Sequence, residues 1–117
     1  MYKRQHSNDI VSSVKLLLFN SSNFSEYNFS GNEEISISDL IYLICQITNV
    51  NFKDIVEFGP ERAGKDMFYR LDCKKALSEL MWKPKVNLRE GIEITVEWIV
   101  RNLDKLSKEN WNYIHKN

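Results

Sequence analysis

The sequence predicts an α/β protein, mostly helices with a few short strands. Three observations lead to this expectation. Capped segments with helical spacing of apolar residues alternate with short segments of alternating polarity. Only about three candidate strands are present, and none of them is a long apolar run like a buried parallel strand. A sheet of about three short strands cannot cover the apolar faces of the helices. We therefore expect the main sheet of the fold to be missing.

The first helix is expected to begin at Asn8 or Asp9, with residues 7 to 9 as candidate caps. The aspartate is interpreted as an N-cap and not as a catalytic acid. Apolar residues follow at helical spacing: Ile10, Val11, Val14, Leu17 and Leu18. The helix should end in the turn-rich sequence FNSSN, and EYNF (26–29) is predicted to be a short strand.

The second helix carries the clearest start signal. Ser36 and Asp39 have the spacing of a capping box, and a wide apolar face follows over residues 40–47. The helix should end between Thr48 and Asn51. DIVEF (54–58) is predicted to be a second strand, stopped by the Gly-Pro pair that follows it.

Two further helices are expected in the C-terminal half. FYRL (68–71) alternates like a strand, and Asp72 can cap a short helix from Cys73 to about Leu80. MWKPKV (81–86) should be extended because proline disfavours helix at the residue before it.

The last helix is predicted from about Leu88 to near Leu106. Asn87 and Glu90 provide its capping box. We expect the polar tail, residues 107–117, to fray.

Composition excludes several classes of protein. Sixteen basic residues balance sixteen acidic ones, so no overall field attracts nucleic acid or an anionic membrane. The apolar stretches are too short to span a bilayer, and no signal peptide is evident. Cys45 and Cys73 lack metal-ligand spacing and are expected to be reduced thiols. A cytoplasmic location is the default expectation.

The first five residues, MYKRQ, are interpreted separately. They match the translation of a common transposase sequencing adapter, with a GTG start codon giving Met1. We therefore expect residues 1–5 to be a sequencing scar, residues 6–106 to be the folded portion, and 107–117 to be a polar tail. The alternative is a short native N-terminus, and the upstream DNA would decide between them.

The loop GPERAGKDM (59–67) has the chemistry of an anion site. Arg62 offers a planar fork of donors for phosphate oxygens, and Lys65 adds a second positive charge. Gly64 permits a backbone bend at positive φ. Taken alone the motif also suits a solvated turn, and it is not a P-loop because the G-x-x-x-x-G-K-[ST] spacing is absent.

The order of elements around this loop resembles the C-terminal part of the extended short-chain dehydrogenase/reductases. The resemblance is greatest to the nucleotide-sugar 4,6-dehydratases, especially the dTDP-glucose type, and covers residues 6 to 103. Members carry R-P-G-H-D-x-x-Y-x-x-D, then E-L-G-W-x-P, then E-G-(I/L)-x-x-T-(V/I)-x-W. The matching residues here are Arg62, Gly64, Asp66, Tyr69, Asp72, Glu79, Leu80, Trp82, Pro84, Glu90, Gly91, Thr95, Val96 and Trp98.

The resemblance implies roles for four residues. Arg62 takes the place of the arginine that binds the diphosphate of the nucleotide sugar. Lys65 replaces a ligand-contacting histidine, and Ser36 lies where an asparagine near the nucleotide is often found. Tyr69 is a further candidate for substrate contact, although a core tyrosine is an equally good interpretation.

Two departures from the family pattern weaken the assignment to the dTDP-glucose enzyme itself. Ala63 stands in place of the usual proline, and Met81 in place of the usual glycine. Trp82 and Pro84 match the pattern, and we expect them to pack and orient the chain, not to contact a ligand.

The resemblance also implies NAD as the cofactor of the intact enzyme. The family binds it with a glycine-rich turn and uses a Tyr-x-x-x-Lys pair in catalysis. None of the five tyrosines is followed by lysine at that spacing, and no glycine-rich turn is present. The chain alone is therefore expected to bind no cofactor, to contain no catalytic residue and to be inactive.

Together these features indicate a fragment of an NAD-dependent nucleotide-sugar dehydratase, which is a lyase. The fragment is expected to supply part of the pocket for the nucleotide-diphosphate sugar. The intact enzyme is expected to be a cytoplasmic homodimer with no nucleic-acid or membrane partner. Two alternatives remain open: a fragment of a nucleotide-sugar 4-epimerase, and a free-standing small binding module without enzymatic activity.

Overall fold

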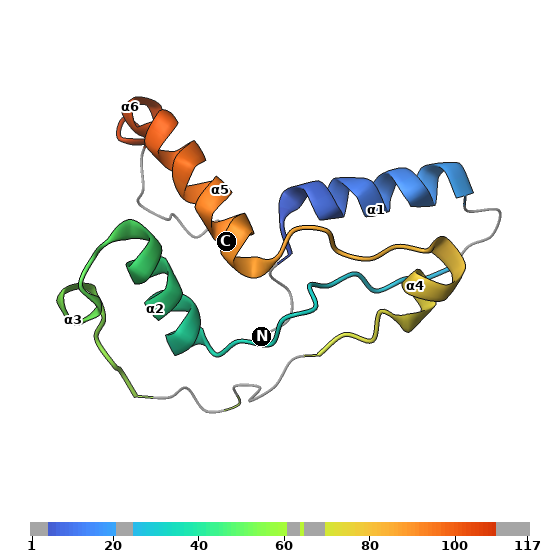
Figure 1. Cartoon of the computed structure of the whole chain (residues 1–117), viewed down its shortest axis with the longest axis horizontal. Coiled ribbons are helices and arrows are strands. Elements are labelled where there is room, and N and C mark those ends of the chain that lie inside the picture. Colours follow the sequence, from blue (N-terminus) through green and yellow to red (C-terminus); the bar gives the residue numbers. More distant parts are fainter. Residues whose placement is uncertain (1–4, 21–24, 61–63, 65–69, 110–117) are drawn as a thin grey trace, which may run out of the picture.

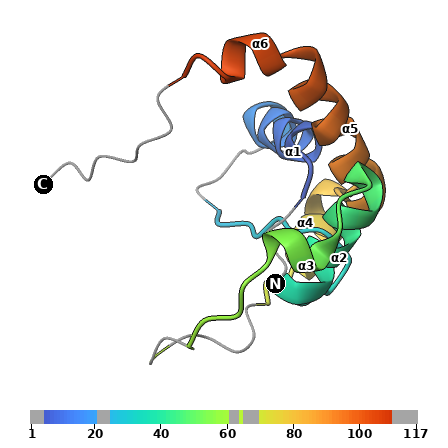
Figure 2. The ribbon, with the colours of Figure 1, turned by 90° about the vertical axis from the view of Figure 1, so that its left-hand side faces the viewer.

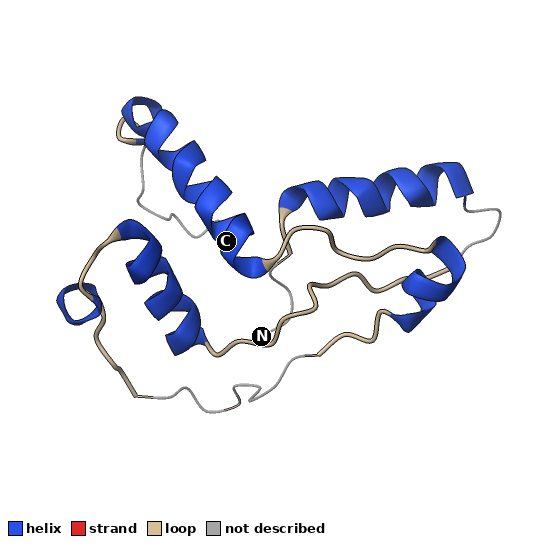
Figure 3. Ribbon diagram, viewed as in Figure 1, coloured by secondary structure: helices blue, strands red, loops and turns tan. Residues whose placement is uncertain are grey.

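The computed structural model describes residues 5–20, 25–60, 64 and 70–109. Within these ranges the chain is helical and contains no strand (Figures 1 and 3). The helices are α1 (Ser7–Asn20), α2 (Ile37–Thr48), α3 (Phe52–Ile55), α4 (Lys74–Leu80), α5 (Leu88–Arg101) and α6 (Leu103–Leu106). No helix in the described part of the chain is long and apolar enough to cross a membrane.

The predicted strands do not form in the described residues. EYNF lies in an extended segment without ladder pairing, and the described end of FYRL, residues 70 and 71, is loop. The segment DIVEF begins inside α3, which Asn51 starts by accepting a hydrogen bond from the Lys53 N–H at 3.3 Å. This asparagine cap was the missed signal, because a side chain that satisfies a free N–H favours a helical turn over a strand.

The extended segments 25–36 and 70–73 nevertheless lie side by side. The Asn28 side-chain amide donates to the Asp72 carbonyl at 3.5 Å, and Ser30 Oγ lies 3.2 Å from Cys73 Sγ. A strand requires backbone-to-backbone pairing with a neighbour. In the described residues these two segments therefore run extended without strand pairing.

Helix α1 covers the segment 81–87, which joins α4 to α5 (Figure 1). The Trp82 indole is 4% exposed, and its N–H donates to Ser12 Oγ at 3.1 Å and to the Asp9 carbonyl at 3.3 Å. The ring meets Phe29 edge to face, with centroids 4.9 Å apart. The expectation that this tryptophan packs in the fold is confirmed, since it joins α1 to the extended segment 25–36.

Helix α1 starts one residue earlier than predicted, and Asp9 is not its cap. The His6 carbonyl accepts from the Asp9 N–H at 3.0 Å, and His6 Nδ1 accepts from the Asn8 N–H at 3.3 Å. The histidine therefore satisfies the first free amides of the helix, which leaves the aspartate carboxylate available for other partners.

The predicted final helix is divided in two. Helix α5 ends at Arg101, and Asn102 separates it from the four-residue α6. The Asn102 side-chain amide donates to the Trp98 carbonyl at 2.8 Å, and so satisfies a carbonyl near the helix end. Figure 2 shows α6 turning away from the line of α5.

Few apolar side chains in the described residues are buried. The buried ones are Leu40, Cys45, Ala76 and Trp82. On α1, Val11, Val14 and Leu18 share one helical face and are 52%, 48% and 75% exposed. On α5, Trp98 is 55% exposed. Apolar faces of α1 and α5 are thus left exposed, as they would be if the main sheet of the fold were missing.

Candidate functional site

Most of the predicted ligand-binding residues lie outside the described part of the chain. These are Arg62, Lys65 and Tyr69, which the structure does not describe. Gly64 is described: its φ is +78° and an added Cβ would meet nothing within 4 Å. The prediction that the loop uses glycine for a left-handed bend is confirmed.

Ser36 is described, and it is the N-cap of α2. Its Oγ accepts from the Asp39 N–H at 3.0 Å and donates to the Asp39 carboxylate at 2.6 Å. A serine hydroxyl has one donor hydrogen and two acceptor lone pairs. One acceptor lone pair is left, so in this geometry Ser36 can accept from a ligand hydroxyl or amide but cannot donate to a phosphate.

An ion pair joins the segment before Ser36 to the residues that follow the 65–69 stretch. The Arg70 guanidinium donates from Nε and Nη2 to Glu34 Oε1 at 2.9 and 2.7 Å, and from Nη2 to Oε2 at 2.9 Å. Charge-assisted contacts at such distances, made to both carboxylate oxygens, fix orientation as well as distance. The two residues are 36 positions apart, so no local sequence pattern predicted this pair.

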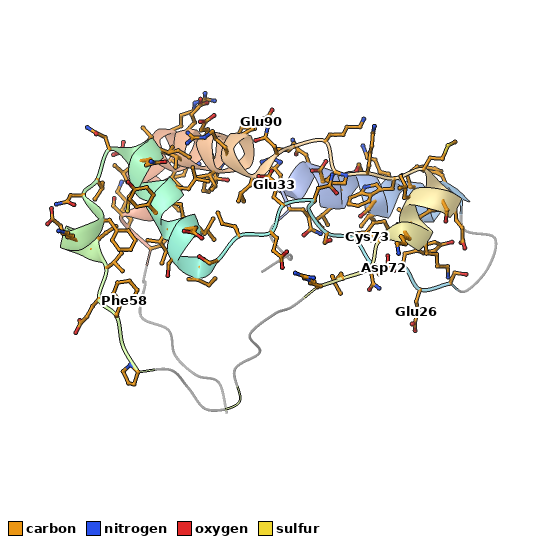
Figure 4. All side chains as sticks on the ribbon, turned by 60° about the horizontal axis from the view of Figure 1, so that its bottom comes forward. Glu26, Glu33, Phe58, Asp72, Cys73 and Glu90 are labelled. Carbon is orange, nitrogen blue, oxygen red and sulfur yellow. The ribbon has the colours of Figure 1, made fainter. Side chains whose placement is uncertain are left out.

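The preceding glutamate lies at the start of α5. The Leu88 N–H donates to Glu33 Oε1 at 2.7 Å, while Asn87 Oδ1 accepts from the Glu90 N–H at 2.9 Å. Figure 4 shows Glu33 and Glu90 near this helix end. Acidic groups at a helix N-terminus are stabilised by its free amides and dipole. The predicted capping box of α5 is confirmed, and Glu33 is an addition that sequence spacing did not reveal.

Asp9 has a structural role that the sequence interpretation missed. The carboxylate is buried, and it accepts from the Lys85 N–H at 3.0 Å and from the Val86 N–H at 3.2 Å. These contacts hold the segment 81–87 against α1. A buried carboxylate needs such donors to offset the loss of water.

A cavity of about 530 Å³ lies between α2, α5 and the first described residues. Its walls are mainly apolar, with Leu40, Ile44, Ile92 and Val96 from the two helices. At Gly91 an added Cβ would make an ordinary van der Waals contact with the His6 ring, at 3.7 Å.

Tyr27, Lys75 and Glu79 form a cluster at α4. The Tyr27 hydroxyl donates to Glu79 Oε2 at 2.8 Å, and Lys75 Nζ lies 4.7 Å from the centre of the Tyr27 ring. The hydrogen bond to Glu79, with a smaller effect of burial, raises the pKa of Tyr27 above its ordinary value. This cluster ties the start of segment 25–36 to α4.

The cysteines in the described residues are free thiols. Cys45 is buried on α2, and Cys73, which Figure 4 labels, is half-buried with its Sγ 3.2 Å from Ser30 Oγ. No group of three or more histidine, cysteine, aspartate or glutamate side chains suited to a metal ion is found in the described ranges.

Met81 lies at the C-terminal end of α4 with φ 50° and ψ 26°, the left-handed conformation. This is the position where the resembled family carries glycine. Left-handed backbone is unfavourable for residues with a Cβ, so the glycine of the pattern has a conformational reason.

The chain resembles dTDP-glucose 4,6-dehydratases in sequence. No protein-family model matches it. The dTDP-glucose 4,6-dehydratase of Haemophilus influenzae is 31% identical over 86 residues, which cover 65% of this chain and 25% of that protein. The enzyme of the same name from Streptomyces antibioticus is 36% identical over 72 residues, 62% of this chain and 21% of that protein.

A comparison of the fold also finds a dTDP-glucose 4,6-dehydratase. A crystal structure of dTDP-glucose 4,6-dehydratase from Bacillus anthracis in complex with NAD matches with a TM-score of 0.76 and 26% identity. The match covers 86% of this chain and 31% of that one. The chain thus spans about a quarter of the length of the curated relatives it matches. Over most of its length, therefore, the chain is homologous to one portion of the dTDP-glucose 4,6-dehydratases.

Proposed function

We propose that this chain is the C-terminal, nucleotide-sugar-binding portion of an NAD-dependent dTDP-glucose 4,6-dehydratase. The structural match to the NAD complex of such an enzyme, at 26% identity over 86% of this chain, is the observation that carries the proposal. In the intact enzyme the hexose would be oxidised at C4, water eliminated across C5 and C6, and the hydride returned at C6. The enzyme would act in the cytoplasm as a homodimer.

The residues of this chain do not fit the NAD site itself. The four glycines are too far apart to form a glycine-rich dinucleotide turn, and no tyrosine is followed by lysine four positions later. The nicotinamide chemistry therefore belongs to other parts of the enzyme. The contribution of this chain is to bind and orient the substrate, which lowers the barrier by holding the reacting groups in register.

Arg62 is proposed to grip the diphosphate with its planar fork of donors, and Lys65 to neutralise the remaining charge. Tyr69 is a further candidate contact. Ser36 is proposed to accept from a hydroxyl or amide of the nucleotide sugar through its remaining lone pair, since its donor hydrogen is engaged with Asp39. These roles leave phosphate recognition to the loop and let Ser36 act on the sugar or the base.

The exposed apolar faces support a portion of a larger enzyme. Side chains such as Val11, Leu18 and Trp98 are at least half exposed. Large apolar side chains exposed on a helix face suit an interface with another protein segment. A free-standing binding module would bury these faces in its own core, so the exposure favours the dehydratase portion over that alternative.

The epimerase alternative shares the scaffold and the diphosphate loop. It differs in lacking the acidic groups that eliminate water, which the resemblance places outside this chain. The matched relatives are named as 4,6-dehydratases, so dehydration is the better proposal.

A binding titration tests the diphosphate role. Thymidine diphosphate and thymidine monophosphate are each titrated into the 117-residue chain and into its Arg62→Ala variant, and amide shifts are followed by NMR. We expect the diphosphate to bind more tightly than the monophosphate, and Arg62→Ala to weaken diphosphate binding about tenfold, the loss typical of a charged hydrogen bond. Equal affinity of the parent and the variant would rule out this role for Arg62.

A further inference from the structure

We propose that α1 and the extended residues 26–30 together form a docking surface for the edge of a β-sheet. The sheet belongs to the remaining part of the dehydratase, so this inference rests on the proposed function. In the assembled enzyme the apolar side of α1 covers one face of the sheet, and the backbone of residues 26–30 pairs with its edge strand.

Helix α1 has its polar side buried and its apolar side exposed. Asp9 and Ser13 are 3% and 2% exposed, whereas Val11 and Leu18 are 52% and 75% exposed. Successive residues of a helix are rotated by about 100°, so Val11 points away from Asp9 and Ser13. The apolar stripe of a helix normally faces the core. The reverse arrangement in the described residues indicates that a further layer packs on α1.

The polar side of α1 is already engaged. The Asp9 carboxylate accepts from the backbone amides of Lys85 and Val86, and the Trp82 indole N–H donates to Ser12 Oγ. Rotation of α1 to bury its apolar side would break these contacts. The apolar side can therefore be covered only from outside the described residues.

The extended residues 26–30 have engaged side chains and free backbone amides. The Asn28 side chain donates to the Asp72 carbonyl, and the Phe29 ring contacts Trp82. Within the described part of the chain, no backbone N–H of residues 26–30 donates a hydrogen bond. An extended backbone with free donors is a template for pairing with another strand.

The two features belong to consecutive elements, which identifies the partner as a sheet. A helix on the face of a sheet, followed by a strand in that sheet, is the layer arrangement of α/β proteins. The matched crystal structure is covered over 31% of its chain, so most of that enzyme lies outside the matched portion and is long enough to supply a sheet. A second copy of this chain has no strand in its described ranges to offer.

Hydrogen exchange tests the strand pairing. The 117-residue chain is compared by mass spectrometry with a full-length chimera, in which residues 6–106 replace the matching quarter of the Haemophilus influenzae enzyme. Protected amides in α2 show that each protein is folded. We expect amides 26–30 to exchange in the 117-residue chain within about tenfold of the rate of unstructured peptide. In the chimera they should exchange at least about a hundredfold more slowly than in the chain alone.

Lysine substitution tests the covering of α1. In the chimera, Val11→Lys should lower the midpoint of thermal unfolding by at least about 4 °C, because it places a charge beneath the sheet. In the 117-residue chain the same change should leave the helix content unchanged. Ile55→Lys on α3 is the matched control, since Ile55 is 59% exposed, and it should shift the midpoint by less than about 2 °C.

The possible failures are distinguishable. If the chimera turns over dTDP-glucose while amides 26–30 exchange as fast as in the chain alone, the docking surface is wrong and the proposed function stands. Equal shifts for Val11→Lys and Ile55→Lys would likewise show that α1 is not covered. Protection of amides 26–30 in the chain alone that grows with its concentration would assign the surface to a second copy. A folded chimera with slow exchange that does not turn over dTDP-glucose would support docking and contradict the proposed function.

Discussion

A single buried carboxylate, that of Asp9, holds the segment between α4 and α5 in place. Its two oxygens accept from the backbone amides of Lys85 and Val86. In Asp9→Asn, one oxygen is replaced by an amide group that faces a backbone N–H, and one acceptor is lost. We expect the variant to reduce the free energy of unfolding by about 1–3 kcal/mol, the cost of an unsatisfied buried group.

Urea unfolding followed by circular dichroism measures this change. Asp104→Asn is the control, because this aspartate is exposed in the first turn of α6, and its effect should stay within about 0.5 kcal/mol. A loss in Asp9→Asn no larger than in the control would show that the two amide contacts do not hold the segment.

Met81 has a left-handed backbone conformation, which is unfavourable for a residue that carries a Cβ. It adopts φ 50° and its side chain is 84% exposed, so removal of the side chain costs little burial. Met81→Gly should raise the free energy of unfolding by about 1 kcal/mol, the strain of a left-handed residue less the extra entropy of glycine when unfolded.

The matched control is Asn49→Gly at the end of α2, where φ is 56°. Asparagine tolerates this conformation, so its replacement should gain much less. Thermal unfolding compares the two variants, and an equal gain at both positions would contradict the account of Met81.

The hydroxyl of Tyr27 makes the free energy of unfolding depend on pH in the alkaline range. Its hydrogen bond to Glu79 raises the Tyr27 pKa in the folded chain above that of the unfolded chain. The contribution is therefore fully present below the ordinary tyrosine pKa of about 10, and is lost as pH rises through the folded value.

Tyr27→Phe removes this contribution. Its stability should be lower than that of the parent at neutral pH, and the difference should shrink above about pH 10. Unfolding measured as a function of pH tests this. A difference that stays constant across the alkaline range would show that the hydrogen bond does not control it.

At the scale of elements, the caps of α2 and α5 were predictable, whereas the caps of α1 and α3 and the predicted strands were not. Ser36 and Asn87 start α2 and α5 as their spacing indicated, because a cap is a local contact between neighbours in sequence. The predicted strand EYNF depends on distant pairing, and its segment makes side-chain contacts to residues 70–73 instead. Alternation of polarity indicates an extended chain, but not whether a partner strand is present.

The start of α2 provides the test at this scale. Ser36→Ala removes the acceptor for the Asp39 N–H and should lower the free energy of unfolding by about 1 kcal/mol. Ser38→Ala is the control inside the same helix, where alanine should be neutral or slightly stabilising. Calorimetric unfolding decides, and an equal response of the two variants would contradict the capping role.

For the candidate site, the sequence predicted the chemical groups of individual residues but not the contacts between distant segments. The donor groups of Arg62 and the bend at Gly64 follow from residue type, and the bend is confirmed. The Glu34–Arg70 pair and the Asp9 contacts join residues 36 and 76 or more positions apart, and no local pattern connects them. They become visible only when the fold brings the segments together.

At the scale of the whole molecule, the exposed apolar face of α1 departs from what a self-contained domain would show. Val11 and Leu18 lie on one face and are 52% and 75% exposed. Replacing both with lysine should reduce self-association in sedimentation experiments without loss of helix, because neither side chain is buried. Gln46→Lys on α2 adds charge elsewhere and is the control; equal reduction by this variant would assign the effect to charge alone.

We propose that this chain performs the substrate-binding task of a dTDP-glucose 4,6-dehydratase. The most direct measurement replaces the matching quarter of the Haemophilus influenzae enzyme with residues 6–106 of this chain and assays turnover of dTDP-glucose. A second chimera carrying the same segment of the Streptomyces antibioticus relative is the control for grafting. We expect turnover in both chimeras, and a KM for dTDP-glucose about tenfold higher when Arg62→Ala is introduced into the first. A folded, NAD-binding chimera that is inactive while the control is active, or a KM unchanged by Arg62→Ala, would contradict it.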